Sequence, residues 1–453
     1  MSTPTLLLFA HQARSYASMI REYVDRLGVT LVILSSKPRD PRDLEQLAAV
    51  GAARLWQVDD EYLNESHLET VLAQARDEGF GIVAALATFE GYRLLMAHTN
   101  VLLGAIDGDP SALRVCMDKL LCRGRLSEAG LSRARATVLD AATLPVLQAS
   151  GRPLFVKPRR GAGSFACFRL DETVTPQRLQ ALREQMQSDK AFRAIFAGQF
   201  DFIVEDYVRG DEYSFEVLAA GGESHVIGVH AKYLDDSSGT TLEMGNSLPA
   251  PRLTDAQQLA GERFIDQCLA ALQLRDGCYH IETRYDAAAE HWDIIEINAR
   301  MGGALINQSV GVFTNGLSML ELWVKTLCVE RDHLLTWRAR LAALRESVRR
   351  RDGTLEYGTV FFSRYGERNR TLEVLSIDGL TPQPDVVEMP VRPQTRLPDS
   401  ERGIFILNAL WKVPIREIAE QLHALSAMLD EQLVIRYSDA AATADDTTTQ
   451  EKS

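Results

Sequence analysis

Hydrophobic residues in the first hundred positions come in short runs, separated by longer stretches with helical spacing. The runs TLLLFA, TLVILSS, ARLWQV and GIVAALAT have the length and composition of strands. Segments between them, such as SYASMIREYVDRL, repeat apolar residues every three or four positions, as amphipathic helices do. Strands that alternate with helices predict a parallel sheet with helices on both faces. Residues 1–110 are therefore expected to form an α/β domain.

The pattern changes beyond this domain. Residues 111–130 are mostly helical in spacing, and strand-like runs such as DFIVEDYV and SHVIGVHAKYL then follow one another up to residue 330. A helix is expected at about 254–272, and an arginine-rich helix and linker at 331–352. Residues 355–437 are predicted to form a last small unit of strands and helices. The chain therefore combines α/β and α+β parts, and its 453 residues fit about three domains.

Composition narrows the class of protein. The chain is 46% hydrophobic and 25% charged, with a formal net charge of −13, which is typical of a soluble globular protein. The basic tract RRR at 349–351 is too short to indicate a nucleic-acid binder. No apolar run is long enough to span a membrane, and no basic segment marks a signal peptide. The acidic end, 438–453, is expected to be disordered.

The cysteines are scattered and form no CxxC pair. A disulfide framework or a zinc site is therefore not expected, and a reducing cytoplasm is the predicted location. The six cysteines are Cys116, Cys122, Cys167, Cys268, Cys278 and Cys328.

The stretch GCYHIETRYDAAAEHWDIIEINAR predicts a hairpin that turns near Ala289. This register places Glu282 opposite Glu296 and His280 opposite Asn298, with opposed side chains ~5 Å apart at Cβ. Two carboxylates so close repel each other unless a cation lies between them. The opposite face of the hairpin is apolar, with Ile281, Ile295 and Ile297, and is expected to face the core.

Carboxylate and amide oxygens are hard ligands that suit Mg²⁺ or Mn²⁺ rather than zinc. Magnesium also takes oxygens from substrate phosphates, which points to a nucleotide. Arg300 shares the face of Glu296 and Asn298, and Gly302 and Gly303 follow at once. On this hairpin alone, a solvated and charged outer strand face explains the residues equally well.

The stretch PLFVKPRRGAGSFACFRL, at 153–170, predicts a strand, a glycine turn and a second strand. Gly161 and Gly163 let the backbone approach an anion, and Lys157 and Ser164 can donate to phosphate oxygens. A dinucleotide fingerprint would need a helix after the glycines, and FACFRL alternates like a strand. The sequence has no P-loop motif either. Taken alone, a plain hairpin turn is the favoured interpretation.

The stretch FIVEDYVRGDEYSFEVLAAGG, at 202–222, places Glu205 at the end of one strand and Glu212 at the start of the next. Glu212, Ser214 and Glu216 share one face. Such a hinge can offer backbone groups to an adenine, and a carboxylate can accept hydrogen bonds from ribose hydroxyls. By itself, the segment is better explained as a surface loop with acidic residues.

Together these segments resemble the ATP-grasp superfamily of carboxylate–amine ligases. CMDKLLCRGRLSEAG, FVKPRRGAGS, VEDYVRGDEYSFEVL and HIETRYD…IIEINARMGG occur in the family's order across about 118–303. HAKYLDDSSGTTLEMGNSLPAPRLT and GTVFFSRYGERN, with the region after it, resemble the L-amino acid ligase (dipeptide synthetase) branch.

The resemblance implies an ATP-grasp fold with a pre-ATP-grasp domain at 1–110 and a C-terminal α+β domain at 331–437. Between them it implies an ATP-grasp domain at 111–330. This domain would consist of a small ATP-binding lid subdomain at about 130–207 and a larger metal and substrate subdomain at about 208–330.

The resemblance also implies roles for individual residues. ATP would be held by Lys119 and Lys157 at the phosphates, by Gly161, Gly163 and Ser164 closing over them, by Glu205, Tyr207 and Val208 at the adenine, and by Glu212 at the ribose. Two Mg²⁺ ions, or Mn²⁺ in their place, would be held by Glu282, Glu296 and Asn298. Arg300 would stabilise the migrating phosphoryl group, and Lys232 would be a further phosphate contact.

Substrate contacts implied by the resemblance are Glu90, His280, Gly302 and Gly303. Taken alone, Glu90 is better explained as a carboxylate in the first turn of a helix, where a negative charge is favourable. His280 is equally explained as a structural neighbour of Asn298. One departure from the family is Ala166, where relatives often have glycine. The glycine turn and the loop at 233–245 are the expected lid over the site.

The reaction implied is ATP-dependent joining of a small carboxylic acid or amino acid to an amine, through an acyl phosphate. An ATP-grasp carboxylase that uses bicarbonate is an alternative, and so is a nucleotide-binding regulatory protein without catalysis. The expected partners are the small-molecule carboxylate and amine, with no nucleic acid and no membrane. The family also suggests a homodimer.

Overall fold

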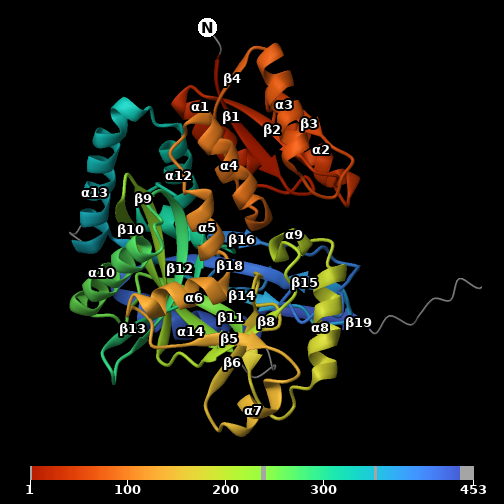
Figure 1. Ribbon diagram of the computed structural model, residues 1–453, viewed down its shortest axis with the longest axis vertical. Helices are drawn as coiled ribbons and strands as arrows, with labels where there is room; N and C mark the ends of the chain where they lie inside the picture. The colour runs from red at the N-terminus through yellow and green to blue at the C-terminus, as the bar shows by residue number, and fades with distance from the viewer. Residues whose placement is uncertain (1–2, 236–240, 351–354, 439–453) are drawn as a thin grey trace, which may run out of the picture.

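A computed structural model describes residues 3–235, 241–350 and 355–438 (Figure 1). The N-terminal domain holds a parallel four-stranded sheet in the order β3-β2-β1-β4. Its strands are β1 (Thr3–Ala10), β2 (Thr30–Ser35), β3 (Arg54–Gln57) and β4 (Phe80–Ala87). Its helices are α1 (Ala17–Leu27), α2 (Pro41–Ala49), α3 (Glu65–Asp77) and α4 (Arg93–Leu103). The predicted parallel sheet is confirmed, and residues 6–10 are buried on both faces of it.

A second, smaller sheet has the order β5-β8-β6-β7 and a hydrophobic core of its own. We call this part of the chain, residues 136–206, the small unit. Its strands are β5 (Ala136–Leu139), β6 (Leu154–Pro158), β7 (Phe168–Arg169) and β8 (Phe202–Asp206). Its helices are α7 (Leu144–Ala149), α8 (Pro176–Ser188) and α9 (Arg193–Phe196). It is joined to the N-terminal domain through α5 (Pro110–Cys116) and α6 (Lys119–Glu128).

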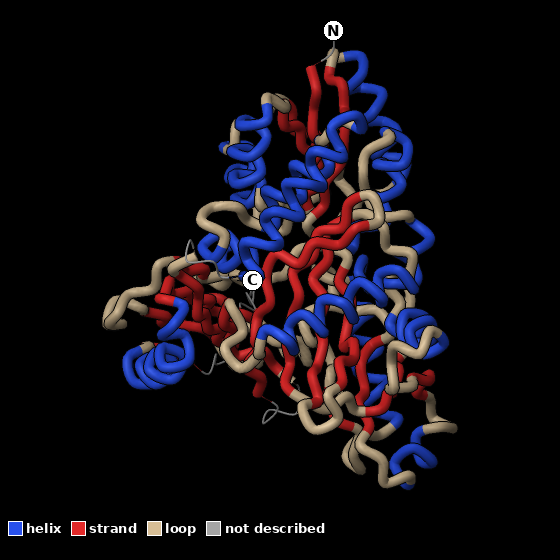
Figure 2. Tube along the Cα trace, turned by 90° about the vertical axis from the view of Figure 1, so that its left-hand side faces the viewer, coloured by secondary structure: helices blue, strands red, loops and turns tan. Residues whose placement is uncertain are grey.

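The largest element is an antiparallel eight-stranded sheet with the order β13-β12-β9-β10-β11-β14-β18-β16. Figure 2 shows its strands as a layer through the centre of the molecule. Five strands come from the central part of the chain: β9 (Asp211–Ala220), β10 (Glu223–Asp235), β11 (Leu242–Leu248), β12 (Gly277–Asp286) and β13 (His291–Asn298). Three come from the C-terminal part: β14 (Tyr357–Tyr365), β16 (Val386–Glu388) and β18 (Phe405–Pro414). One sheet therefore runs through both parts.

Helices cover this sheet, and a small three-stranded sheet extends the C-terminal part. The helices are α10 (Asp255–Ala271), α11 (Ile306–Phe313), α12 (Met319–Cys328), α13 (Leu334–Arg350) and α14 (Ile418–Gln432). The small sheet consists of β15 (Thr371–Ser376), β17 (Thr395–Arg396) and β19 (Val434–Ser438). Short 3-10 turns are η1 (Glu90–Tyr92), η2 (Arg331–His333) and η3 (Ile415–Glu417).

The second strand expected after the glycine turn is much shorter than the sequence suggests. Only Phe168 and Arg169 form β7, because Gly163, Ser164 and Ala166 all have positive φ and keep the chain in a turn. The alternation of FACFRL therefore reflects packing of Phe residues against the small unit's core rather than a long strand.

All six cysteines are free, as predicted. Among the described residues, no helix has the length and apolar character needed to cross a bilayer. The middle of the expected lid loop at 233–245 lies outside the described residues, and so does most of the tail at 438–453.

Candidate active site

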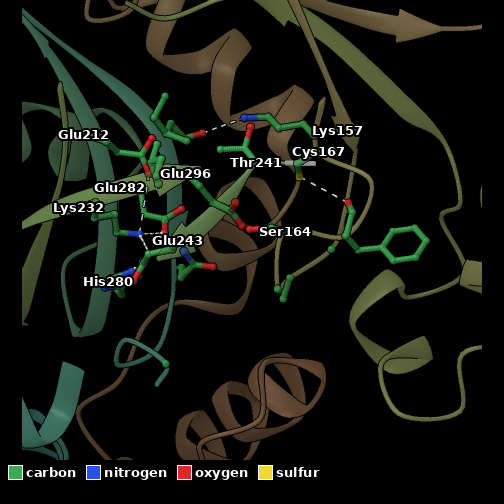
Figure 3. A pocket seen from close by; sticks show the side chains of 18 of the residues that line it. Lys157, Ser164, Cys167, Glu212, Lys232, Thr241, Glu243, His280, Glu282 and Glu296 are labelled. Atoms are coloured by element: carbon green, nitrogen blue, oxygen red, sulfur yellow. Dashed lines mark hydrogen bonds and ion pairs between the residues drawn. The ribbon is translucent and has the colours of Figure 1, made fainter. Parts of the chain in front are cut away.

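A deep pocket lies where the small unit, the large sheet and the C-terminal strands meet, and Figure 3 shows its side chains. It gathers most of the residues singled out from the sequence. The predicted residues that line it are Lys119, Lys157, Gly161, Gly163, Ser164, Glu205, Tyr207, Val208, Glu212, Lys232, His280, Glu282, Glu296, Asn298, Arg300 and Gly303. Glu90 and Gly302 do not line it. The structure thus brings distant motifs together around one cavity.

The predicted hairpin register is confirmed. Glu282 pairs with Glu296 and His280 pairs with Asn298 across β12 and β13. A bulge beside Glu282 then shifts the pairing by one residue, so Ile294 packs in the core with Ile297.

The expectation that Ile295 faces the core is wrong. Its side chain is only half-buried, and the residue lines the pocket, because the bulge turns it away from Ile297. The backbone oxygen of Ile295 accepts a hydrogen bond from Lys157 Nζ at 3.0 Å. The irregular strand therefore gives the pocket an apolar wall as well as charged residues.

Two lysines lie beside the paired carboxylates. Lys119 Nζ is 3.0 Å from Glu296 and donates to the backbone oxygen of Gly161 at 2.9 Å. Lys232 forms an ion pair with Glu282 and a second one, at 2.6 Å, with Glu243. The fold therefore sets a positive charge beside each carboxylate.

The two carboxylates differ in their titration. Burial raises the pKa of Glu296, and the negative charge of Glu282 raises it further against the opposing effect of Lys119. Burial would also raise the pKa of Glu282, but Lys232 and His280 outweigh it and hold the pKa well below its ordinary value. Glu282 is therefore ionised, and an added cation would favour ionisation of Glu296.

The donor set fits magnesium. Asn298 is only 5% exposed and lines the pocket, yet its side-chain amide has no hydrogen-bond partner among the described residues. Glu282 and Glu296 add carboxylate oxygens, which Mg²⁺ prefers together with phosphate oxygens. Within the described residues, no group of three or more His, Cys, Asp or Glu side chains forms a ready-made metal cage. Such a site would need oxygens from a bound phosphate.

Arg300 lies between the pocket and the N-terminal domain. Its Nε is 3.1 Å from Glu90 Oε2, and its Nη1 donates to the backbone oxygen of Met301 at 2.9 Å. Glu90 is the first residue of η1 and is 7% exposed. Glu90 therefore lies in the first turn of a helix and also contacts an arginine that lines the pocket.

His280 lies beneath the carboxylates. Its Nδ1 is 2.8 Å from Glu216 Oε1, and its Nε2 is 3.4 Å from Glu282. Burial would lower the pKa of His280, but the contact with Glu216 outweighs burial and raises the pKa to about 9. Gly302 lies against this ring, since an added Cβ would be 2.9 Å from His280 Nδ1. His280 and Gly302 therefore pack next to the paired carboxylates of the hairpin.

Glu205 is buried and forms ion pairs with two cationic side chains. Its carboxylate contacts Lys157 at 2.5 Å and Arg123 at 3.2 Å. Burial alone would raise the pKa of Glu205, but Arg123 and Lys157 lower it below the ordinary value. The carboxylate therefore fixes Lys157 in the pocket.

Arg284 is a site residue that the sequence motifs did not indicate. Its Nε is 3.0 Å from Glu212, its Nη1 donates to the backbone oxygen of Val208 at 2.7 Å, and its guanidinium lies 4.9 Å from the Tyr207 ring centroid. It thus ties the hinge after β8 to the carboxylate at the start of β9. Its place in the alternation of β12, two residues after Glu282, was the available signal.

The C-terminal part also supplies pocket residues that local motifs could not reveal. Tyr365 and Phe405 line the pocket and pack together with ring centroids 4.7 Å apart. The Tyr365 hydroxyl donates to the backbone oxygen of Glu243 at 2.9 Å. They come from β14 and β18, so only the pairing of distant strands brings them to the site.

The ATP-grasp domain family matches residues 150–308. The fold is similar to the crystal structure of L-amino acid ligase from Bacillus licheniformis, with a TM-score of 0.73, 19% identity and coverage of 97% of this chain and 100% of that one. A search of curated proteins finds no match.

Other ATP-grasp structures are similar too. The biotin carboxylase–β,γ-ATP complex from Campylobacter jejuni has a TM-score of 0.64, 13% identity and coverage of 96% of this chain and 92% of that one. Carboxyaminoimidazole ribonucleotide synthase from Aspergillus clavatus, complexed with ATP, has a TM-score of 0.63, 14% identity and coverage of 95% and 98%.

The resemblance found in the sequence is confirmed. Residues 150–308 match the ATP-grasp domain family, and the chain has the ATP-grasp fold from its N-terminal sheet to its C-terminal strands.

Proposed function

We propose that this protein joins a small carboxylic acid, most simply an amino acid, to the amine of an amino acid, using ATP and an acyl-phosphate intermediate. One observation carries the proposal. Glu282 and Glu296 face each other in register, with a lysine beside each and Arg300 at the same edge of the pocket. Binding a neutral metabolite would not need this convergence of charge.

The nucleotide would lie along the pocket from the hinge to the hairpin. Lys157 and Lys119 would contact its phosphates, with the turn at 161–164 covering them. Tyr207 and Val208 would flank the adenine, and Glu212 the ribose. Pinning of Lys157 by Glu205 and of Glu212 by Arg284 supports these roles, because neither side chain needs to reorganise when ATP binds.

Glu282, Glu296 and Asn298 would hold Mg²⁺, whose charge would neutralise the phosphate oxygens during transfer. Two further side chains would act on the phosphates beside these metal ligands. Arg300 would contact the transferred phosphoryl group, and its ion pair with Glu90 supports this role by fixing the guanidinium. Lys232 supplies a second positive charge at the hairpin.

The chemistry has two steps. A carboxylate oxygen attacks the γ-phosphorus of ATP, the bond to the β-phosphate oxygen breaks, and ADP leaves. The amine nitrogen then attacks the carbonyl carbon of the acyl phosphate, a C–N bond forms, the C–O bond breaks, and phosphate and a proton leave. Water would hydrolyse the acyl phosphate. The aromatic side chains of Phe165, Tyr365 and Phe405 line the pocket and would exclude water, which supports the proposal.

Similarity along the whole chain to an L-amino acid ligase supports a dipeptide as the product. The proposal includes the domain limits expected from the sequence, which are 1–110, 111–330 and 331–437. Within 111–330, the small unit would be the lid over ATP. We also propose a homodimer, which sedimentation analysis would test directly.

The test is a screen for phosphate release over pairs of amino acids and small carboxylic acids, with mass spectrometry of the products. We expect ADP and phosphate to appear only with certain pairs, together with one amide product. The matched control is Glu296→Gln, which keeps the size of the side chain. ADP release that depends on bicarbonate and needs no amine, or nucleotide binding with no phosphate release by any pair, would contradict the proposal.

A further inference from the structure

The small unit is attached to the N-terminal domain by a short loop between α8 and α9. We call this loop, residues 189–192, the docked segment. The backbone oxygen of Lys190 accepts two hydrogen bonds from the N-terminal domain, from Tyr62 Oη at 2.7 Å and from Gln12 Nε2 at 3.0 Å. Two donors on one carbonyl hold the segment more firmly than surface packing alone would.

His11 completes this contact and is buried, with 8% of its surface exposed. Its Nε2 is 2.8 Å from the backbone oxygen of Ala191, which can only accept, so Nε2 carries a proton. Burial lowers the pKa of His11 to about 4, so the ring is neutral near pH 7. Its Nδ1, 3.0 Å from Tyr92 Oη, therefore accepts from that hydroxyl.

A second contact holds the docked segment from the C-terminal side. Arg402 forms an ion pair with Asp189 at 2.9 Å, and its guanidinium lies 3.8 Å from the Phe192 ring centroid. The neighbouring Glu401 accepts a hydrogen bond at its backbone oxygen from the amide of Ala166, at 3.4 Å. Two adjacent residues therefore hold these parts: Arg402 holds the docked segment, and Glu401 holds the glycine turn.

The contact between the N-terminal domain and the docked segment is adjacent to the residues that hold Arg300. The His11 ring stacks on Phe89, with centroids 3.9 Å apart and planes 5° apart, and Phe192 meets the edge of Phe89 at 6.3 Å. Phe89 directly precedes Glu90, the carboxylate that holds Arg300 at 3.1 Å. Gly91 lets α9 approach, since a Cβ there would lie 2.8 Å from Ala194 Cβ.

We propose that docking of residues 189–192 couples closure of the small unit over the nucleotide to the placement of Arg300, with His11 as the positioning residue at the junction. The inference rests on the proposed function. Docking packs the segment and α9 against the turn that carries Glu90, so the arginine is fixed only while the small unit is closed. An open small unit leaves that turn, and the guanidinium it holds, without this support.

Hydrogen exchange of the full chain without ligands tests the docking. The variants are His11→Leu, which removes the donor to Ala191, and Tyr62→Phe, which removes one hydroxyl near the surface. The matched control is Tyr23→Phe, whose hydroxyl contacts Ser318 at 3.0 Å and not the small unit. We expect exchange of the amides in 189–195 to rise roughly five-fold in both variants, and that of 89–92 to rise in His11→Leu, with no change in the control.

Steady-state turnover tests the coupling. We expect His11→Leu to lower kcat roughly ten-fold while KM for ATP changes less than two-fold, and to release more phosphate per amide formed. His11→Gln keeps an N–H donor toward Ala191, and it should recover most of the loss. Tyr62→Phe removes only a hydroxyl at an exposed contact and leaves the core unchanged, and it should show the same change to a smaller extent.

Unchanged exchange of 189–195 in both variants would overturn the docking. Raised exchange with unchanged kcat and unchanged phosphate-to-amide ratio would overturn the coupling to Arg300. Exchange in 89–92 and 299–301 reports the coupling without any turnover, so failure of the proposed ligase reaction can be told apart from failure of this inference.

Discussion

Glu296 lies among charges of both signs, with Lys119 at 3.0 Å and Glu282 opposite it on the next strand. Its side chain is 20% exposed, and burial with repulsion from Glu282 raises its pKa. In the absence of a cation this arrangement disfavours the ionised carboxylate. The residue is therefore placed for binding a cation rather than for stability.

Replacing Glu296 by Gln should lower ATP turnover by at least about 100-fold, because a charged metal ligand is lost. Thermal unfolding of the ligand-free variant should show a Tm equal to or above that of the wild type, since repulsion with Glu282 disappears. Turnover within ten-fold of wild type would contradict the assigned role.

Helix α6 shows how an element aims a functional side chain. Asp118 is its N-cap, accepting hydrogen bonds from the amides of Leu120 and Leu121 at 3.1 and 3.2 Å, and it also pairs with Arg159 at 2.7 Å. Lys119 follows as the first helical residue. The cap thus fixes the direction in which the lysine leaves the helix.

Substituting Asp118 by Ala should reduce the free energy of unfolding by about 1 kcal/mol or more, because both the cap and the ion pair are lost. KM for ATP should rise in parallel as Lys119 loses its direction. Asp118→Asn retains a capping oxygen and should lose less of both. Equal losses for the two variants in denaturant titration would argue against the capping role.

Strand β10 carries His225, which is 1% exposed and has no partner for either ring nitrogen among the described residues. Burial, and to a smaller extent the positive charge of Arg345, lower its pKa to about 4. The folded protein therefore holds a neutral ring, whereas the unfolded chain takes up a proton below about pH 6.5. This term favours folding above pH 6.5 and is lost as pH falls through about 4.

Replacing His225 by Leu should raise the free energy of unfolding by about 1 kcal/mol at pH 7, because a buried polar group without a partner is removed. The advantage over wild type should grow as pH falls from 6.5 to 4. Denaturant titrations of both proteins at several pH values measure this, and a constant difference would contradict the titration of His225.

The hairpin shows what the sequence could predict at this scale. Its register followed from the turn near Ala289 and the alternation of Glu282 and Glu296, both of which are local. The bulge that turns Ile295 toward the pocket was not predictable, since an extra residue in a strand leaves the alternation on either side intact. Local patterns therefore predicted the pairing of Glu282 with Glu296, but they did not predict that Ile295 lines the pocket.

At the scale of the molecule, the large sheet joins the central and C-terminal parts. Strand β14 pairs with β11, and residues such as Phe361 and Leu410 pack with Ile306 of α11. Tyr365 and Phe405 reach the pocket only through these pairings. The pairing of β11 with β14 links residues more than 100 positions apart, so the sequence predicted the presence of C-terminal strands but not their place in the site.

A chain ending at residue 350 should not fold as an independent unit. Removing β14, β16 and β18 would expose the edge of β11 and the apolar faces packed against the missing strands. We expect an aggregating product and, for the full chain, a common unfolding transition for the central and C-terminal parts. A soluble truncated protein with cooperative unfolding would show that the two parts are separate.

The central claim is that Glu282, Glu296 and Asn298 bind a divalent cation together with the phosphates of ATP. Electron paramagnetic resonance of Mn²⁺, with a non-hydrolysable ATP analogue, tests it most directly. The account predicts that bound Mn²⁺ appears when protein and analogue are both present, and that Glu296→Gln loses most of it. The same Mn²⁺ signal in wild type and Glu296→Gln, or no bound Mn²⁺ in the wild type, would contradict the account.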